Sequence, residues 1–98
     1  MANKKMMIKN KKKSVYVGLA ADILHEGHIN ILKKASSLGS VTVGLLTDQA
    51  IASYKNIPYL SFTQRKIVLQ NIKYVDKIVP QKTLDYVPNL NLFKPDIV

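Results

Sequence analysis

The chain alternates short apolar runs with amphipathic segments. Residues 14–20 contain adjacent β-branched and aromatic side chains, which is typical of a strand buried on both faces. A polar segment with a glycine follows over residues 22–28, and apolar positions then recur at helical spacing up to Gly39, which is suited to end a helix. Those positions are Ile31, Leu32, Ala35 and Leu38. The pattern predicts a strand, a loop and a helix in that order.

A second unit of the same kind follows. Residues 41–46 form another apolar run, and Thr47 and Asp48 after it are suited to cap a following turn of helix. We expect residues 57–62 to form an ordered loop and Thr63 to open the next helix. The expected apolar face of that helix consists of Ile67, Val68, Ile72 and Val75.

The last third of the chain repeats the alternation more weakly. Residues 78–79, before Pro80, predict a short third strand, residues 87–93 a weak helix, and residues 97–98 the start of a fourth strand. Strands that alternate with helices predict an α/β fold with a parallel sheet covered on both faces. Ligands of such sheets bind beyond the carboxyl ends of the strands, so the loop after the first strand is the first place to seek a site.

Charge divides the chain into two parts. The formal net charge is +9, and six lysines fall within residues 1–13, which we expect to be a disordered arm. Residues 14–98 then form one domain whose smaller basic excess suits a small anion such as a nucleotide. The domain carries no aromatic and arginine stripe of the kind that binds nucleic acid, so we expect no nucleic-acid partner.

Composition also excludes several classes of protein. The chain has no cysteine, which excludes disulfides and thiolate zinc sites. Its longest apolar runs are far shorter than the roughly 20 residues that span a bilayer, and residues 1–13 lack the apolar region of a secretory signal. We therefore expect a cytoplasmic protein without a membrane span.

The candidate chemistry lies in His25-Glu26-Gly27-His28, where the first predicted helix begins. Two imidazoles three residues apart can face one way from the first turn and bind one anion, and a helix N-terminus favours phosphate. Gly27 leaves the approach open. The alternative is that the histidines cap the helix or lie in solvent. A zinc site is a second alternative, but the sequence offers no third ligand nearby.

The same residues carry a resemblance to a known family. Residues 17–28 resemble the HxGH motif of the cytidylyltransferase-like nucleotidyl transferases, including the preceding aspartate and apolar residues. Further blocks resemble, in order and spacing, those of glycerol-3-phosphate, phosphoethanolamine and phosphocholine cytidylyltransferases. These blocks are residues 44–48, Lys55, residues 64–66 and residues 71–76. Residues 47–60 and 83–86 are most similar to domains of phosphonate metabolism, the CTP:2-aminoethylphosphonate cytidylyltransferases, some of them fused to phosphoenolpyruvate mutase.

The resemblance implies a Rossmann-like fold and a role for each matching residue. His25, His28 and Lys55 would be catalytic, the histidines by contacting the triphosphate and Lys55 as a mobile cation. The implied nucleotide-binding residues are Gly18, Leu19, Ala20, Asp22, Gly27, Arg65 and Lys73. No resident metal site is implied, and Mg²⁺ would come with CTP.

Several of these positions have a plainer interpretation. By helical pattern alone Arg65 is a surface residue and Lys55 an exposed loop lysine. Asp22 could order the loop, form a turn or help to place Mg²⁺. Lys73 stands where family members often have arginine, so a contact there would lack bidentate geometry.

The implied function is transfer of CMP from CTP to a small phosphonate or phosphate acceptor, with release of pyrophosphate, by a homodimer. The family pattern continues into Gly-Asp-Asp-Trp and Ile-Ser-Ser-Thr blocks that this sequence lacks, so we expect a domain truncated at its C-terminus. The alternatives are an adenylyl-transferring relative that uses ATP, and an inactive nucleotide-binding fragment.

Overall fold

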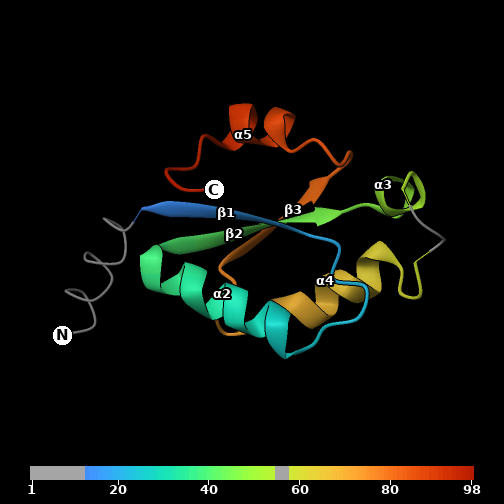
Figure 1. Cartoon of the computed structure of the whole chain (residues 1–98), viewed down its shortest axis with the longest axis horizontal. Helices are drawn as coiled ribbons and strands as arrows, with labels where there is room; N and C mark the ends of the chain where they lie inside the picture. Colours follow the sequence, from blue (N-terminus) through green and yellow to red (C-terminus); the bar gives the residue numbers. More distant parts are fainter. Residues whose placement is uncertain (1–12, 55–57) are drawn as a thin grey trace.

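The computed structural model describes residues 13–54 and 58–98, and within them it is an α/β structure (Figure 1). The strands form one parallel sheet in the order β1-β2-β3. They are β1 (Ser14–Leu19), β2 (Ser40–Leu46) and β3 (Lys77–Gln81). The helices are α2 (Glu26–Leu38), α3 (Asp48–Ala52), α4 (Phe62–Gln70) and α5 (Val87–Phe93). The predicted fold class is confirmed. The expected arm, residues 1–13, lies outside the described residues apart from Lys13.

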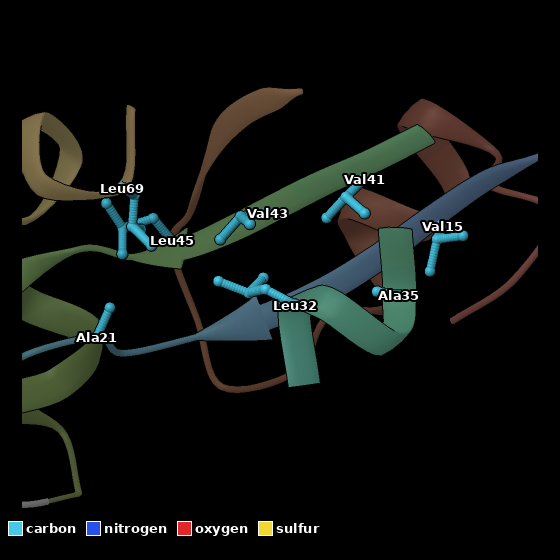
Figure 2. Packing of buried hydrophobic residues seen from close by; sticks show 8 residues of the cluster. All are labelled: Val15, Ala21, Leu32, Ala35, Val41, Val43, Leu45 and Leu69. Atoms are coloured by element: carbon cyan, nitrogen blue, oxygen red, sulfur yellow. The ribbon is translucent and has the colours of Figure 1, made fainter. Parts of the chain in front are cut away.

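Helices cover both faces of the sheet. In Figure 1, α2 and α4 lie on one side and α5 on the other. Because side chains alternate along a strand, one set of β1 and β2 residues packs against α2 and α4. Figure 2 shows this core. Its buried members are Val15, Ala21, Leu32, Ala35, Val41, Val43, Leu45 and Leu69. A smaller cluster joins α3 to the end of β2 through Leu46, Ala50 and Ile51.

The last residues return to the free edge of β1. Ile97 pairs with Val15 in a parallel bridge, and the Tyr16 N–H donates to the Ile97 carbonyl over 2.8 Å. The predicted start of a fourth strand is therefore confirmed. Since β2 and β3 lie on the other side of β1, the strand order reverses at β1. The loop after β1 thus begins at the point where ligands of open α/β sheets bind.

The first helix and the second strand agree with the sequence pattern. Within α2, Leu32 and Ala35 are buried, whereas Ile31 and Leu38 at the margins of the apolar stripe are about half exposed. Thr47 caps α3, because its side-chain oxygen accepts the Ala50 N–H. The predicted capping role of this position is confirmed.

The prediction for α4 was wrong in its bounds and in part of its face, since Ile72 and Val75 do pack against the core but lie beyond the end of the helix. The helix begins at Phe62, because Ser61 and Gln64 form a capping box, and it ends at Gln70 before reaching Val75. Its expected core residues Ile67 and Val68 are 54% and 44% exposed. The buried residues are instead Leu69 and Arg65. Arg65 can occupy the inner face because its guanidinium finds polar partners there, which a hydrophobic pattern does not register.

Strand β3 is longer than predicted and includes Pro80, which is paired in register with Leu45. Within the described residues β3 is an edge strand, where the missing N–H of a proline can be tolerated. The predicted helix over residues 87–93 matches α5.

Candidate functional site at the start of α2

Two histidines form the cap of α2. His25 is the N-cap residue with extended backbone angles, φ −142° and ψ 179°, and its Nδ1 accepts the Gly27 N–H over 3.0 Å. In return, Nδ1 of His28 accepts the His25 N–H over 3.3 Å. Imidazoles here take the places that serine or threonine and glutamate or glutamine usually take in a capping box. The capping interpretation of the sequence is therefore confirmed, and it fixes both rings.

This cap determines which ring nitrogens carry protons. A nitrogen that accepts a hydrogen bond carries no proton, so in the neutral ring the proton is on Nε2. Neither Nε2 has a hydrogen-bond partner within the described part of the chain. The ring centroids of His25 and His28 lie 4.2 Å apart at 54°. The cap thus leaves two neighbouring Nε2–H donors for a ligand.

The surroundings of His28 favour its neutral form. Partial burial lowers the pKa of His28, and the nearby His25 lowers it further. A lower pKa keeps Nδ1 of His28 available as an acceptor in the cap. Helix α2 adds the positive end of its dipole at the same place. His25 is exposed, so an anion could reach this turn from solvent.

Gly27 is explained by the cap itself. A Cβ added at Gly27 would lie 2.7 Å from Cε1 and 3.0 Å from Nδ1 of His25. The glycine therefore leaves room for the imidazole that caps the helix. The prediction that it also opens the path of a phosphate stays a prediction.

Asp22 ties the loop after β1 to the segment before α4. Its two carboxylate oxygens accept the N–H groups of Tyr59 and Leu60 over 3.0 Å and 2.9 Å. The loop-ordering role considered for Asp22 therefore has a direct structural basis. Its role in placing Mg²⁺ stays a prediction.

Arg65 is buried, so the expectation of a surface position was wrong. Nη1 donates to the Ala20 and Leu46 carbonyls over 2.7 Å and 2.6 Å, and Nε donates to the Leu60 carbonyl over 3.1 Å. Nη2 pairs with Asp48 over 2.7 Å. Each of these hydrogen bonds joins Arg65 to the protein. Direct contact with a nucleotide is a prediction that none of these bonds supports.

The other predicted site residues lie at two different edges of the sheet, the one where strands end and the one where strands begin. Gly18, Leu19 and Ala20 lie at the end of β1 and lead into the histidine loop. Lys73 follows α4 at the edge where the strands begin, with its Nζ 5.2 Å from the Tyr74 ring centre. The structure therefore does not bring Lys73 to the histidines. Lys55 lies outside the described residues.

Sequence reasoning missed a buried polar network on the α5 side of the sheet. The Tyr16 hydroxyl donates to Oε1 of Gln81 over 2.6 Å and accepts from Nδ2 of Asn89 over 2.9 Å. Burial raises the pKa of Tyr16, and the hydrogen bond from Asn89 partly offsets this. A Cβ at Gly44 would collide with the Tyr16 hydroxyl. A glycine inside an apolar strand was the signal that a large side chain crosses there.

Residues 13–54 and 58–98 contain no group of three or more histidine, aspartate or glutamate side chains placed to hold a metal ion. No helix in these ranges has the length and apolar character needed to cross a bilayer.

Known proteins are similar to this chain in sequence and in fold. Glycerol-3-phosphate cytidylyltransferase of Bacillus subtilis is 39% identical over 62 residues, which are 62% of this chain and 48% of the relative. FAD synthase of Archaeoglobus fulgidus is 32% identical over 77 residues, 79% of this chain and 56% of the relative. The chain thus spans about half the length of these relatives.

A solved structure gives the same fold. The lipopolysaccharide core biosynthesis protein from Thermoplasma volcanium superposes with a TM-score of 0.80 at 28% identity, over 86% of this chain and 70% of that one. The family model described as cytidylyltransferase-like matches residues 16–98, which includes the histidine cap and every described helix. The chain belongs to the cytidylyltransferase-like family.

Proposed function

We propose that this chain is the nucleotide-binding part of a cytidylyltransferase that moves CMP from CTP to a small phosphonate or phosphate acceptor and releases pyrophosphate. The observation that carries the proposal is the cap of α2, in which Nδ1 of His25 and of His28 accepts a backbone N–H and leaves Nε2–H as a donor. The Bacillus subtilis relative, a glycerol-3-phosphate cytidylyltransferase by name, supports CMP as the transferred group.

The reaction needs no protein nucleophile. An acceptor oxygen forms a bond to the α-phosphorus of CTP in line, and the bond from that phosphorus to the pyrophosphate oxygen breaks. The Nε2–H groups of His25 and His28 donate to phosphate oxygens, and the N–H groups of the first turn of α2 add partial positive charge. Both donors are held by the cap before the nucleotide arrives, so they need no reorganisation as charge develops.

Lys55 and Mg²⁺ complete the proposal. Lys55 would add a cation from the segment before Pro58, as the family resemblance implies. Mg²⁺ would enter with CTP and share the charge of its phosphates. The oxygens of Asp22 already accept two backbone amides, so we assign no protein ligand to the ion.

The acceptor and the assembly rest on the resemblance alone. The residues after β2 and β3 resemble those of 2-aminoethylphosphonate cytidylyltransferases, so we place the acceptor among 2-aminoethylphosphonate, phosphocholine, phosphoethanolamine and glycerol 3-phosphate. A homodimer is expected on the same basis.

The experiment uses variants that keep the cap and remove only the proposed donors. Asparagine is a favoured N-cap residue and glutamine fits the third helical position of a capping box, so His25→Asn and His28→Gln should preserve α2. We expect each variant to fold and to lose CTP affinity and pyrophosphate release by about 100-fold or more. Ser37→Ala, in the last turn of α2, is the control. Normal pyrophosphate release from both histidine variants would contradict the proposal.

A second candidate function is adenylyl transfer. The observation in its favour is the FAD synthase relative, because FAD contains an adenosine monophosphate unit. Calorimetric titration of the chain with CTP, ATP and GTP in the presence of Mg²⁺ separates the two functions, since tighter binding of ATP would favour adenylyl transfer. Nucleotide binding without pyrophosphate release would identify this chain as a binding fragment.

A further inference from the structure

Arg65 links three segments that the sequence keeps apart. Its guanidinium binds the carbonyl at the end of the β1 segment, Ala20, the carbonyl at the end of β2, Leu46, and the carbonyl of Leu60 before α4. The side chain is fully buried. Four N–H groups of the guanidinium are directed at oxygens of the protein, so this cation acts on the fold at the edge of the sheet where the site lies.

Asp22 closes a ring with Arg65 through one peptide unit. Leu60 donates its N–H to Asp22 over 2.9 Å, and its carbonyl accepts from Arg65 over 3.1 Å. Arg65 in turn holds Ala20, two residues before Asp22, over 2.7 Å. The loop after β1 is therefore fixed at two points against the same short segment.

The backbone between those two points is unusual. Ala21 has φ 53°, in the left-handed region that costs a residue with a side chain about 1 kcal/mol or more, and it is buried. Such a conformation persists only where neighbouring contacts determine it. Here the contacts on either side are those of Arg65 with Ala20 and of Asp22 with Leu60. The loop then runs three residues further to the His25 cap.

We propose that Arg65 and Asp22 are positioning residues that together hold the loop of residues 20–24, and so set the position of the His25 and His28 rings, without contacting the nucleotide. The inference rests on the proposed function, because it assigns these residues a role in nucleotide affinity. It differs from the role implied by family resemblance, in which Arg65 itself binds the nucleotide.

The experiment compares Asp22→Asn with Asp76→Asn. Asp76 is a matched control, because its carboxylate also accepts a backbone N–H, that of Val41 over 2.8 Å, but at the edge where the strands begin. We expect Asp22→Asn to raise the dissociation constant of CTP about tenfold or more, whereas Asp76→Asn should leave it within about twofold of the wild type. Equal affinities of the two variants, with both folded, would overturn the inference.

Two further readouts separate positioning from direct contact. If Asp22 acted by holding Mg²⁺, its loss would weaken CTP binding only with Mg²⁺ present, whereas positioning predicts the same fold-loss with EDTA. Asp48 pairs with Arg65, so Asp48→Asn should weaken CTP binding if Arg65 positions the loop. If Arg65 bound phosphate directly, removing this competing carboxylate would strengthen binding. Loss confined to Mg²⁺, or tighter binding by Asp48→Asn, would overturn the inference.

A readout without nucleotide keeps this test distinct from that of the proposed function. In Asp22→Asn and Arg65→Lys we expect faster amide exchange at Leu60 and altered imidazole ¹⁵N shifts of His25 and His28 in the nucleotide-free chain. A wild type that binds neither CTP nor ATP would contradict the proposed function alone. Unchanged imidazole shifts in both variants would contradict the positioning role alone. Should Arg65→Lys fail to fold, Asp22→Asn decides the matter.

Discussion

The edge of the parallel sheet where strands begin and the edge where strands end bind their backbone groups with side chains of opposite charge. Where strands begin, aspartates accept two backbone N–H groups: Asp96 binds the Ser14 N–H and Asp76 the Val41 N–H, each over 2.8 Å. Where strands end, the Arg65 cation binds the carbonyl of Ala20, just after β1, and that of Leu46, the last residue of β2. Each edge therefore carries the charge that its backbone groups attract.

The edges differ in how the charges are shared. The two aspartates are separate, exposed side chains, and each serves one strand. Arg65 is one buried side chain that serves two strands, the Leu60 segment and Asp48 together. At the edge with separate aspartates, each substitution should affect only the strand that its aspartate binds. At the edge where strands end, loss of Arg65 should affect all of its partner segments together. This edge also carries the histidines.

The largest expected effect is that of Arg65→Met. Methionine can fill much of the same volume but leaves the buried Leu46 carbonyl and the half-buried Ala20 carbonyl without their donor. We expect the free energy of unfolding to fall by about 3–5 kcal/mol, a large share of the stability of a small domain. Urea denaturation followed by circular dichroism measures it. A loss of less than about 1 kcal/mol, the size expected for a surface ion pair, would contradict the shared-partner account.

A smaller effect is expected at the other edge. Asp76→Asn and Asp96→Asn each weaken the hydrogen bond that an exposed carboxylate accepts from a strand N–H, so we expect losses of about 0.5–1.5 kcal/mol apiece. Because the two aspartates accept N–H groups of different strands, the double variant should show the sum of the single losses within about 0.5 kcal/mol. The same denaturation experiment applies. Strong non-additivity would show that this edge is also one unit.

The smallest expected effect is a pH dependence at the cap of α2. The pKa of His28 is lower in the folded chain than its ordinary value of 6.5, so the unfolded chain binds this proton more tightly. The free energy of unfolding should therefore fall as pH drops through about 6.5 and level off below the folded pKa. In His28→Gln this part of the slope should vanish. Thermal midpoints at pH 8 to pH 5 measure it, and an unchanged slope in the variant would refute the assignment to His28.

Local pattern predicted most of the fold. Residues 14–20 and 41–46 give two central strands because continuous apolar runs are what a sheet covered on both faces requires. Helix α4 was the exception, because its inner face depends on Arg65. A cation there is stable only through carbonyls of segments 5, 19 and 45 residues away in sequence, and no helical periodicity contains that information.

The candidate site was predicted from the same local pattern, and its role in binding a nucleotide stays a prediction. His25 and His28 were identified from their place at a helix start after a buried strand. Their mutual capping was only one of the alternatives, because the choice depends on backbone angles at His25. The role of Asp22 could not be derived, since its partners lie 37 and 38 residues further along the chain.

The proposed function requires that Nδ1 of both imidazoles caps α2 while Nε2–H of both donates to the nucleotide. Long-range ¹H–¹⁵N spectra of His25 and His28, recorded while CTP is added to the chain, test this directly. We predict that Nδ1 of both rings stays unprotonated in its cap while both Nε2 resonances shift and saturate with CTP. Nε2 resonances that do not change at saturating CTP, or nucleotide binding that protonates Nδ1 and breaks the cap, would contradict it.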